Sequence, residues 1–272
     1  MFRLRCLSNT FSSTFNLSIM KKIFKSLLFS LLAFVPMGMQ AQKLHYNAGL
    51  ETTHLWRGLE VSKGLTFDNE FSLSDNNNHF RVGLWGGMQI NGDYKEFDYY
   101  VNFNHSGFNL AVWDIYNFSD GLAPEGSDWY KIGNYNCRTT GHFIDAAVSY
   151  DFAVKAGFPL TLYWSTILAG RDRGTANKQN IYSSWVQASY KFYEDEQFRV
   201  DGSVAGAFAL NNYDENANDH FYGKSSGIND VRLGCTYKLK VGKHPMPVTA
   251  QGIWNPEANK GYFRVGITLL DL

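Results

Sequence analysis

Residues 95–104 read Lys-Glu-Phe-Asp-Tyr-Tyr-Val-Asn-Phe-Asn. Every second position from Phe97 to Phe103 is apolar or aromatic, and the positions between them are mostly polar, from Asp98 to Asn102. Alternation with a period of two predicts a β-strand, because successive side chains of a strand point to opposite faces. This stretch therefore predicts a strand with one apolar face and one mostly polar face.

The same alternation recurs along the chain. Apolar side chains at alternate positions from Val231 to Val241, and again from Phe263 to Leu269, oppose polar or small ones. Most such segments reach the roughly 9–11 residues that a tilted membrane-spanning strand needs. The predicted strands cover residues 44–57, 63–73, 79–90, 95–104, 107–118, 141–151, 159–169, 180–193, 197–210, 227–241, 246–254 and 260–270.

The connectors between the predicted strands alternate in length. Compact ones follow even-numbered strands, whereas the long ones near 119–140, 170–179 and 211–226, rich in Asn, Asp and Gly, follow odd-numbered strands. In a bilayer every backbone polar group must be hydrogen-bonded, so strands cross it only as a closed barrel. We therefore predict an all-β, up-and-down antiparallel transmembrane β-barrel of about 12 strands, with compact turns and both termini in the periplasm and long loops outside.

Residues 20–41 have the features of a signal peptide. A basic start is followed by an apolar run from Ile23 to Val35 and by the small residue Ala41 before a predicted cleavage site. The apolar run is too short to predict a spanning helix. Residues 1–19 are interpreted as a mis-annotated start, because a complete leader already begins at the second methionine; a genuine extension is the alternative. The outer-membrane β-barrel is expected to span residues 42–272.

The composition agrees with a barrel and argues against other classes. The mean hydropathy is −0.28 and 16% of residues are aromatic, as expected where strands face lipid on alternate residues only. The formal net charge is zero, so nothing favours nucleic acid as a partner. Cys137 falls in a predicted loop and Cys235 on a predicted lipid-facing strand. These placements argue against a disulfide, and no cysteine has the spacing of a metal ligand.

Charged residues of the strands are expected to line the lumen if the apolar faces point outward. Acids come mainly from the second, fourth and sixth predicted strands and bases mainly from the eighth, tenth and twelfth, so opposite walls carry opposite charge. The residues expected in the outer half of the lumen, where we predict a constriction, are Arg57, Glu96, Asp98, Asp145, Arg232 and Arg264.

Two interpretations of this charge pattern stay open. In the first, a transverse field across a wet constriction orients polar or zwitterionic solutes. In the second, the charges pair with one another in a network that plugs a narrow barrel. A 12-stranded barrel lies between the side-chain-filled barrels of about eight strands and the open channels of about sixteen, so strand number does not decide between them.

A lipid-hydrolysing barrel is a third and weaker alternative. The segment His105-Ser106-Gly107 falls in a predicted periplasmic turn without a third orienting group. His142 lacks a serine two residues on and is interpreted as a girdle or rim histidine. Acyl hydrolysis needs a nucleophile, a base and an orienting group within hydrogen-bond reach. The sequence therefore predicts no enzyme, no cofactor and no metal.

Several short motifs follow one another in a characteristic order over nearly the whole mature chain. They are His54-Leu55-Trp56-Arg57-Gly58, Gly83-Leu84-Trp85-Gly86, Glu96-Phe97-Asp98, Trp113-Asp114-Ile115-Tyr116, Thr140-Gly141-His142 with Asp145, Trp164-Ser165-Thr166, Ala169-Gly170-Arg171-Asp172 and Tyr182-Ser183-Ser184. Their order and spacing resemble the TorF-like porins of Gram-negative outer membranes and a related group of outer-membrane barrel proteins. The resemblance implies a barrel with a pore role and no assigned solute. The chain departs from the pattern at Ile115, which separates an otherwise adjacent Asp-Tyr pair, and at its last residue, Leu272, where such barrels usually end in an aromatic.

We therefore expect a passive channel for small polar solutes in the outer membrane of a Gram-negative cell, exported by its signal peptide. Its expected partners are outer-membrane lipids and the solutes themselves, and its transport needs no cofactor. The alternative is a closed structural or surface-interaction barrel that works through its long outer loops, above all the one near 119–140.

Overall fold

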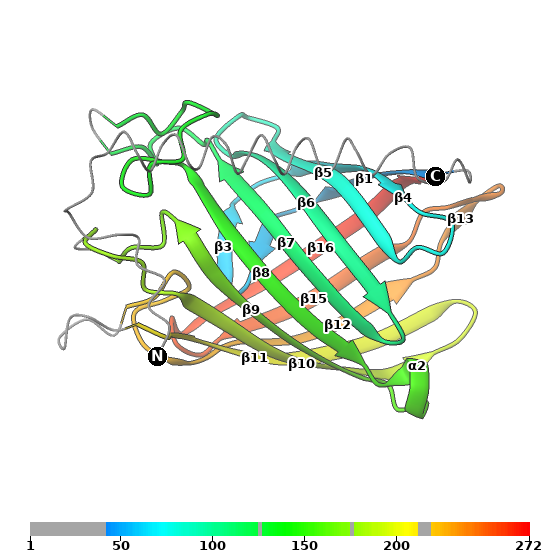
Figure 1. The fold of residues 1–272 in the computed structure, drawn as a ribbon. Coiled ribbons are helices and arrows are strands. Elements are labelled where there is room, and N and C mark those ends of the chain that lie inside the picture. The colour runs from blue at the N-terminus through cyan, green and yellow to red at the C-terminus, as the bar shows by residue number, and fades with distance from the viewer. Residues whose placement is uncertain (1–41, 125–126, 175–176, 212–218) are drawn as a thin grey trace. The chain divides into compact units, whose positions relative to one another are not determined.

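Twelve strands close into one antiparallel barrel in the computed structural model, which describes residues 42–124, 127–174, 177–211 and 219–272 (Figure 1). The first strand, β1, closes the ring against the last, β16. The predicted all-β antiparallel barrel of about 12 strands is confirmed. The ring consists of β1 (Lys43–Glu51), β4 (Thr66–Ser74), β5 (Phe80–Gln89), β6 (Lys95–His105), β7 (Phe108–Asn117), β8 (His142–Asp151), β9 (Leu160–Gly170), β10 (Ser183–Glu194), β11 (Phe198–Ala209), β12 (Gly227–Tyr237), β15 (Val248–Asn255) and β16 (Lys260–Asp271).

The barrel has two different ends, which we call the turn end and the loop end. The turn end carries the compact connectors, together with the short helix α2 (Ala153–Ala156) and the small hairpin of β13 (Lys240–Val241) and β14 (His244–Pro245). The loop end carries the connectors around 118–141, 171–182 and 210–226. The predicted order of compact and long connectors therefore matches the fold. The predicted leader at 20–41 lies outside the described residues.

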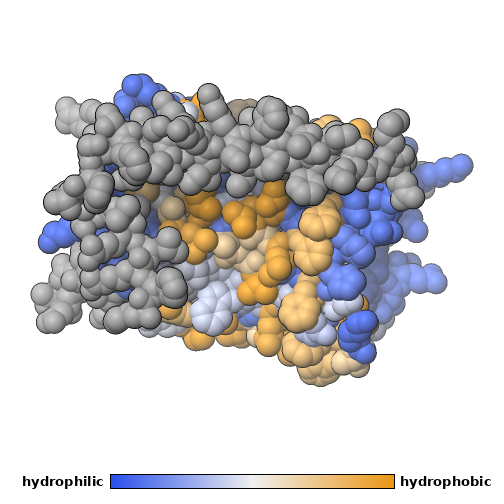
Figure 2. Space-filling model, in the orientation of Figure 1, coloured by the Kyte–Doolittle hydropathy of each residue, from blue (hydrophilic) through white to orange (hydrophobic). Residues whose placement is uncertain are grey.

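The outer surface of the barrel is apolar around its middle. Large side chains at alternate positions of the strands are exposed there, for example Leu84 on β5, Leu233 on β12 and Phe263 on β16, the last with 67% of its surface exposed. Figure 2 shows hydrophobic residues gathered in a band across this face and hydrophilic residues at the turn end. The alternation seen in the sequence therefore places its apolar side chains on the outside, as predicted.

The first strand is shorter than predicted. It ends at Glu51 instead of residue 57, and the chain then forms a hairpin of β2 (His54–Trp56) and β3 (Leu59–Ser62) that belongs to no wall strand pair. Arg57 and Gly58 at its tip both have positive φ, 48° and 77°, as a tight two-residue hairpin turn requires. We call residues 54–62 the inner hairpin, because its contacts, described below, lie inside the ring of strands.

The barrel interior near the loop end holds an apolar core. Inward side chains of the wall pack there against aromatic residues of the inner hairpin and of the connector before β12. Trp185 and Phe143 are each only 1% exposed. The cluster comprises Ile115, Phe143, Ile167, Trp185, Ala205, Ala207 and Tyr222, with Trp56, Leu59, Trp113, Tyr163 and Phe221 packed against it.

Two smaller features bear on the sequence predictions. Within the described residues, Cys137 and Cys235 form no disulfide, and Cys235 is exposed on the outer face of β12. Among the same residues, no helix has the length and apolar character needed to span a membrane.

Candidate functional site

The inner hairpin is fixed to the opposite wall by one arginine. Nη1 and Nη2 of Arg57 donate to the two carboxylate oxygens of Asp145 on β8, at 2.9 and 2.5 Å. Nη1 also donates to the hydroxyl of Tyr222 at 2.6 Å, and Nη2 to that of Tyr163 on β9 at 2.8 Å. Asp145 is fully buried. A two-pronged arginine–carboxylate pair of this kind is both strong and orientation-specific.

Aromatic rings surround the same guanidinium group. The Arg57 carbon Cζ lies 4.6 Å from the ring centre of Trp56 and 5.6 Å from that of Tyr222. Trp56 in turn packs against Phe143 and Phe221, with ring centres 5.7 and 6.0 Å apart. The arginine is therefore held by charge, hydrogen bonds and cation–π contacts together.

The tip of the inner hairpin also touches the wall on the side of β12 and β15. Nδ2 of Asn255 donates to the carbonyl oxygen of Gly58 at 3.0 Å. A Cβ atom at Gly58 would lie 2.5 Å from the carbonyl oxygen of Asn229, so only glycine fits this close approach. Because the hairpin starts between β1 and β4 and reaches β8, β9, β12 and β15, it crosses the lumen.

The six residues predicted to form a constriction lie in four separate groups. Arg57 and Asp145 form the pair just described. Arg264 on β16 donates to Glu51 at 2.9 Å and to Gln251 at 2.6 Å. Nη2 of Arg232 on β12 lies 2.7 Å from Oδ2 of Asp230, two residues earlier on the same strand. Glu96 and Asp98 lie together on β6. The bases predicted on one wall are thus largely neutralised by nearby acids, so they do not form one ring of charge.

Arg171 is a functional candidate that the charge pattern missed. It follows β9, and its guanidinium lies 5.1 Å from the ring centres of Trp129, Phe143 and Phe221. Burial lowers the pKa of Arg171 to about 10, although the carboxylates of Glu96, Asp98 and Asp172 act in the opposite direction. The sequence signal was the Gly-Arg-Asp motif at 170–172, where a charged pair directly follows a strand.

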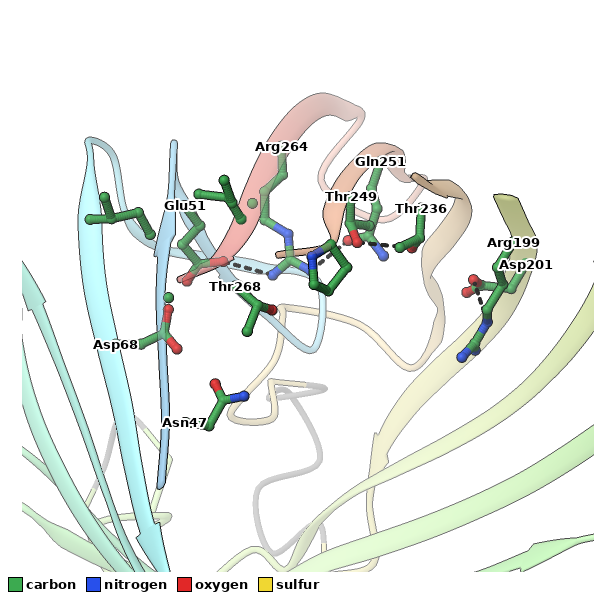
Figure 3. Close-up of a pocket in the computed structure, with 15 residues that line it drawn as sticks. Asn47, Glu51, Asp68, Arg199, Asp201, Thr236, Thr249, Gln251, Arg264 and Thr268 are labelled. Atoms are coloured by element: carbon green, nitrogen blue, oxygen red, sulfur yellow. Dashed lines mark hydrogen bonds and ion pairs between the residues drawn. The ribbon is translucent and has the colours of Figure 1, made fainter. Parts of the chain in front are cut away.

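Beneath the inner hairpin, the half of the barrel nearer the turn end contains a polar chamber (Figure 3). Its volume is about 320 Å³, and its walls come from β1, β4, β11, β12, β15 and β16. We call it the turn-end chamber. The charged side chains that line it are Glu51, Asp68, Arg199, Asp201 and Arg264.

His142, expected at the rim, lies at the loop end but is buried, with 1% of its surface exposed. Its Nδ1 is 2.8 Å from Oδ1 of Asp114 and its Nε2 is 3.0 Å from the carbonyl oxygen of Ile132. The other oxygen of Asp114 accepts a hydrogen bond from Tyr135 at 2.6 Å. Both ring nitrogens of His142 thus lie within hydrogen-bond distance of oxygen atoms. The residue fastens the connector 118–141 to the outside of the wall and is not placed to act as a base.

A serine–histidine contact does occur, at residues that the sequence analysis did not single out. Oγ of Ser74 lies 2.9 Å from Nε2 of His45 and 2.8 Å from Oδ1 of Asn78. The amide oxygen only accepts, so the hydroxyl hydrogen points to Asn78, and His45 donates to Ser74. This pair therefore lacks the proton arrangement that activates a nucleophile. In the described residues, no group of three or more His, Cys, Asp or Glu side chains is placed to hold a metal ion.

Comparisons with known proteins give structural neighbours and no sequence relatives. No protein-family model matches the chain, and no curated protein matches it. Among solved structures, an outer membrane channel from Pseudomonas putida F1 is similar with 12% identity and a TM-score of 0.42 over 85% of this chain and 95% of that one. The NanC porin has 11% identity and a TM-score of 0.43 over 83% and 98%. OmpF of Salmonella typhi has 9% identity and a TM-score of 0.37 over 85% and 97%. The resemblance to the TorF-like porins stays a prediction.

Proposed function

We propose that this protein is an outer-membrane channel for small polar solutes, closed by its inner hairpin in the described conformation. The apolar band matches a lipid environment, and the leader predicted at 20–41 would deliver the chain to the periplasm. In this arrangement the turn end faces the periplasm and the loop end faces outside. Membrane lipids contact the band, and the solutes pass through the lumen.

The observation that carries the proposal is a hairpin that crosses the lumen without being part of the wall, next to a polar chamber lined by wall strands. Each wall strand is hydrogen-bonded to two neighbours, whereas β2 and β3 pair only with each other. Thr53 and Ser62 close the base of the inner hairpin, since Oγ1 of Thr53 donates to the carbonyl oxygen of Ser62 at 2.6 Å. Movement of the hairpin out of the lumen would therefore break none of the backbone hydrogen bonds between wall strands.

The competing function is a permanently closed barrel that acts through its outer loops. The apolar core near the loop end favours it, because Trp185, Phe143 and Ile167 are buried against the inner hairpin as in a protein interior. The two functions differ in what removal of the hairpin does. A channel gains a pore, and a barrel with a fixed core loses stability.

The experiment compares the refolded wild-type protein with a variant in which residues 54–61 are replaced by two glycines. The short link is long enough, because Thr53 and Ser62 already touch. A matched control replaces residues 240–245, the small hairpin β13–β14 at the turn end, by two glycines. Planar bilayers record conductance, and proteoliposome swelling in sugars and amino acids records solute entry.

We expect brief or rare openings in the wild type and in the control, and a steady conductance in the variant without the inner hairpin. All three should run as folded barrels whose gel mobility changes on heating. A folded variant without conductance would overturn the channel proposal and favour the closed barrel.

A further inference from the structure

The turn-end chamber contains one carboxylate that is not committed to a cation. Glu51 is held by Arg264 at 2.9 Å, and Asp201 by Arg199 at 3.3 Å. Asp68, on β4 beside the strand that carries Glu51, has no hydrogen bond or ion pair within the described residues. Figure 3 shows its carboxylate facing the chamber without a dashed line, whereas the other two acids have one.

The wall beside Asp68 is hollowed by a glycine. In the strand register, Gly49 on β1 lies opposite Asp68 on β4 and opposite Thr268 on β16. Asp68, Gly49 and Thr268 therefore form one row across three neighbouring strands, with the glycine in the middle. The missing side chain lets the Asp68 carboxylate pack closely against the backbone of Gly49, and we call this place of close contact the Gly49 notch.

Oxygen atoms converge on this notch. A Cβ atom on Gly49 would lie 3.2 Å from Oδ2 and 3.4 Å from Oδ1 of Asp68, and 3.2 Å from the carbonyl oxygen of Ile267. The pairing of β1 with β16 shifts between Ala48 and Gly49 and passes over Leu269, so the ladder is irregular here. Such irregularities leave backbone groups outside the regular ladder and often lie beside binding sites.

The chemistry of these groups selects a cation with N–H donors. A carboxylate and a carbonyl oxygen only accept hydrogen bonds, and an ammonium group has three donors and no acceptor. Asn47, which lines the chamber two residues before Gly49, offers a further amide oxygen. An anion would be repelled by the Asp68 carboxylate. The two arginines of the chamber offset this repulsion little, because Arg199 and Arg264 already have acid partners.

We propose that Asp68 and the Gly49 notch form a binding subsite for the ammonium group of a small organic cation that enters the turn-end chamber. As a statement about which solutes pass, the inference rests on the proposed channel function. As a statement about binding, it stands alone, because the chamber lies on the turn-end side of the inner hairpin and needs no open pore. The subsite would give the channel a preference for amines over neutral or acidic solutes of the same size.

The test measures binding of ethylammonium chloride to the refolded full chain in detergent by saturation-transfer NMR. Asp68→Asn keeps the shape of the side chain and removes its charge. Gly49→Ala keeps every charge and fills the notch with a methyl group. Glu196→Gln is the matched control, because it removes one negative charge from an exposed position at the same end of the barrel.

We expect saturable binding to the wild type and to Glu196→Gln. Both Asp68→Asn and Gly49→Ala should bind about tenfold more weakly or worse, as expected when a charge-assisted hydrogen bond is lost. Equal binding to all four proteins would overturn the subsite. Displacement of ethylammonium by an equal concentration of potassium chloride would also overturn it, because potassium has no N–H donor.

The two proposals fail separately. Asp68-dependent binding in a protein whose hairpin-less variant does not conduct would remove the channel and keep the subsite. Conduction without Asp68-dependent binding would keep the channel and remove the subsite.

Discussion

Replacing Arg57 with alanine is expected to open the barrel without unfolding its wall. The change removes both donors to Asp145 and the hydrogen bonds to Tyr163 and Tyr222. Asp145 is 0% exposed, so its charge stays buried without a cation as long as the inner hairpin remains in the lumen. Breaking a buried ion pair by removing one partner costs about 3–5 kcal/mol.

That cost falls on the closed position of the inner hairpin, because water reaches Asp145 once the hairpin leaves. Every 1.4 kcal/mol changes an equilibrium about tenfold. The ratio of open to closed barrels should therefore rise about a hundredfold to a few thousandfold in Arg57→Ala. The double variant Arg57→Ala/Asp145→Ala should open less than Arg57→Ala, because it leaves no buried charge behind.

Single-channel recording measures the open fraction, and the heat-dependent gel mobility of each variant shows that the wall is folded. Arg138→Ala is the control, since it removes an exposed arginine from the connector 118–141 at the same end. An open fraction of folded Arg57→Ala equal to that of the wild type would refute the reasoning. So would a double variant that is more open than the single one.

Three further predictions test other parts of the account. Burial raises the pKa of Asp172 to about 6 from an ordinary 3.8, so the folded protein binds this proton more tightly than the unfolded protein. The stabilisation from this proton is complete below about pH 4, and the free energy of unfolding falls by about 3 kcal/mol as the pH rises through 6. Urea unfolding between pH 4 and 7 should show this loss in the wild type and not in Asp172→Asn, and parallel profiles would contradict it. Cys235 lies on the outer face of β12. In a bilayer and a Cys137→Ser background, it should react with a lipid-soluble maleimide and resist a charged one. Equal reaction rates with the two maleimides would place Cys235 outside the lipid. Arg264→Ala should leave Glu51 without its arginine and raise cation preference in the reversal potential of the open channel, whereas unchanged selectivity would show that ions do not pass this wall.

The barrel itself was predictable because its signal is local. The alternation at 95–104 became β6, and the outward positions of β5, β12 and β16 are exposed as the pattern requires. Each such segment needs only the two-residue period of a strand and lipid on one side. Pattern reasoning therefore found every ring strand, with errors of a few residues at the ends.

The inner hairpin was not predictable from the same signal. The alternation weakens after Glu51, but no glycine or proline marks the end of the wall strand before Gly58. The turn depends on Arg57 at a φ of 48°, a conformation that is uncommon for residues other than glycine. Its stabilising partner Asp145 lies 88 residues further along the chain. No local rule connects the two, because the contact exists only once the barrel has closed.

The burial of His142 has a similar cause. The strand pattern places it on the outward face of β8, next to Tyr116 on β7. The connector 118–141 then folds over that face and supplies Tyr135 and the carbonyl oxygen of Ile132. A period-two pattern describes wall strands and contains no information about where a long connector packs.

The most direct test of the central claim is a reversible covalent bridge in place of the ion pair. The variant Arg57→Cys/Asp145→Cys, with Cys137→Ser and Cys235→Ser, has lost the pair and the contacts of Arg57 with Tyr163, Tyr222 and Trp56, so it is expected to conduct more than the wild type, although less than Arg57→Ala. A short, reducible bis-thiol crosslinker should then join the hairpin to β8 and silence the channel, and a reductant should restore conductance. A bridge that forms without changing conductance would show that the inner hairpin does not close the barrel.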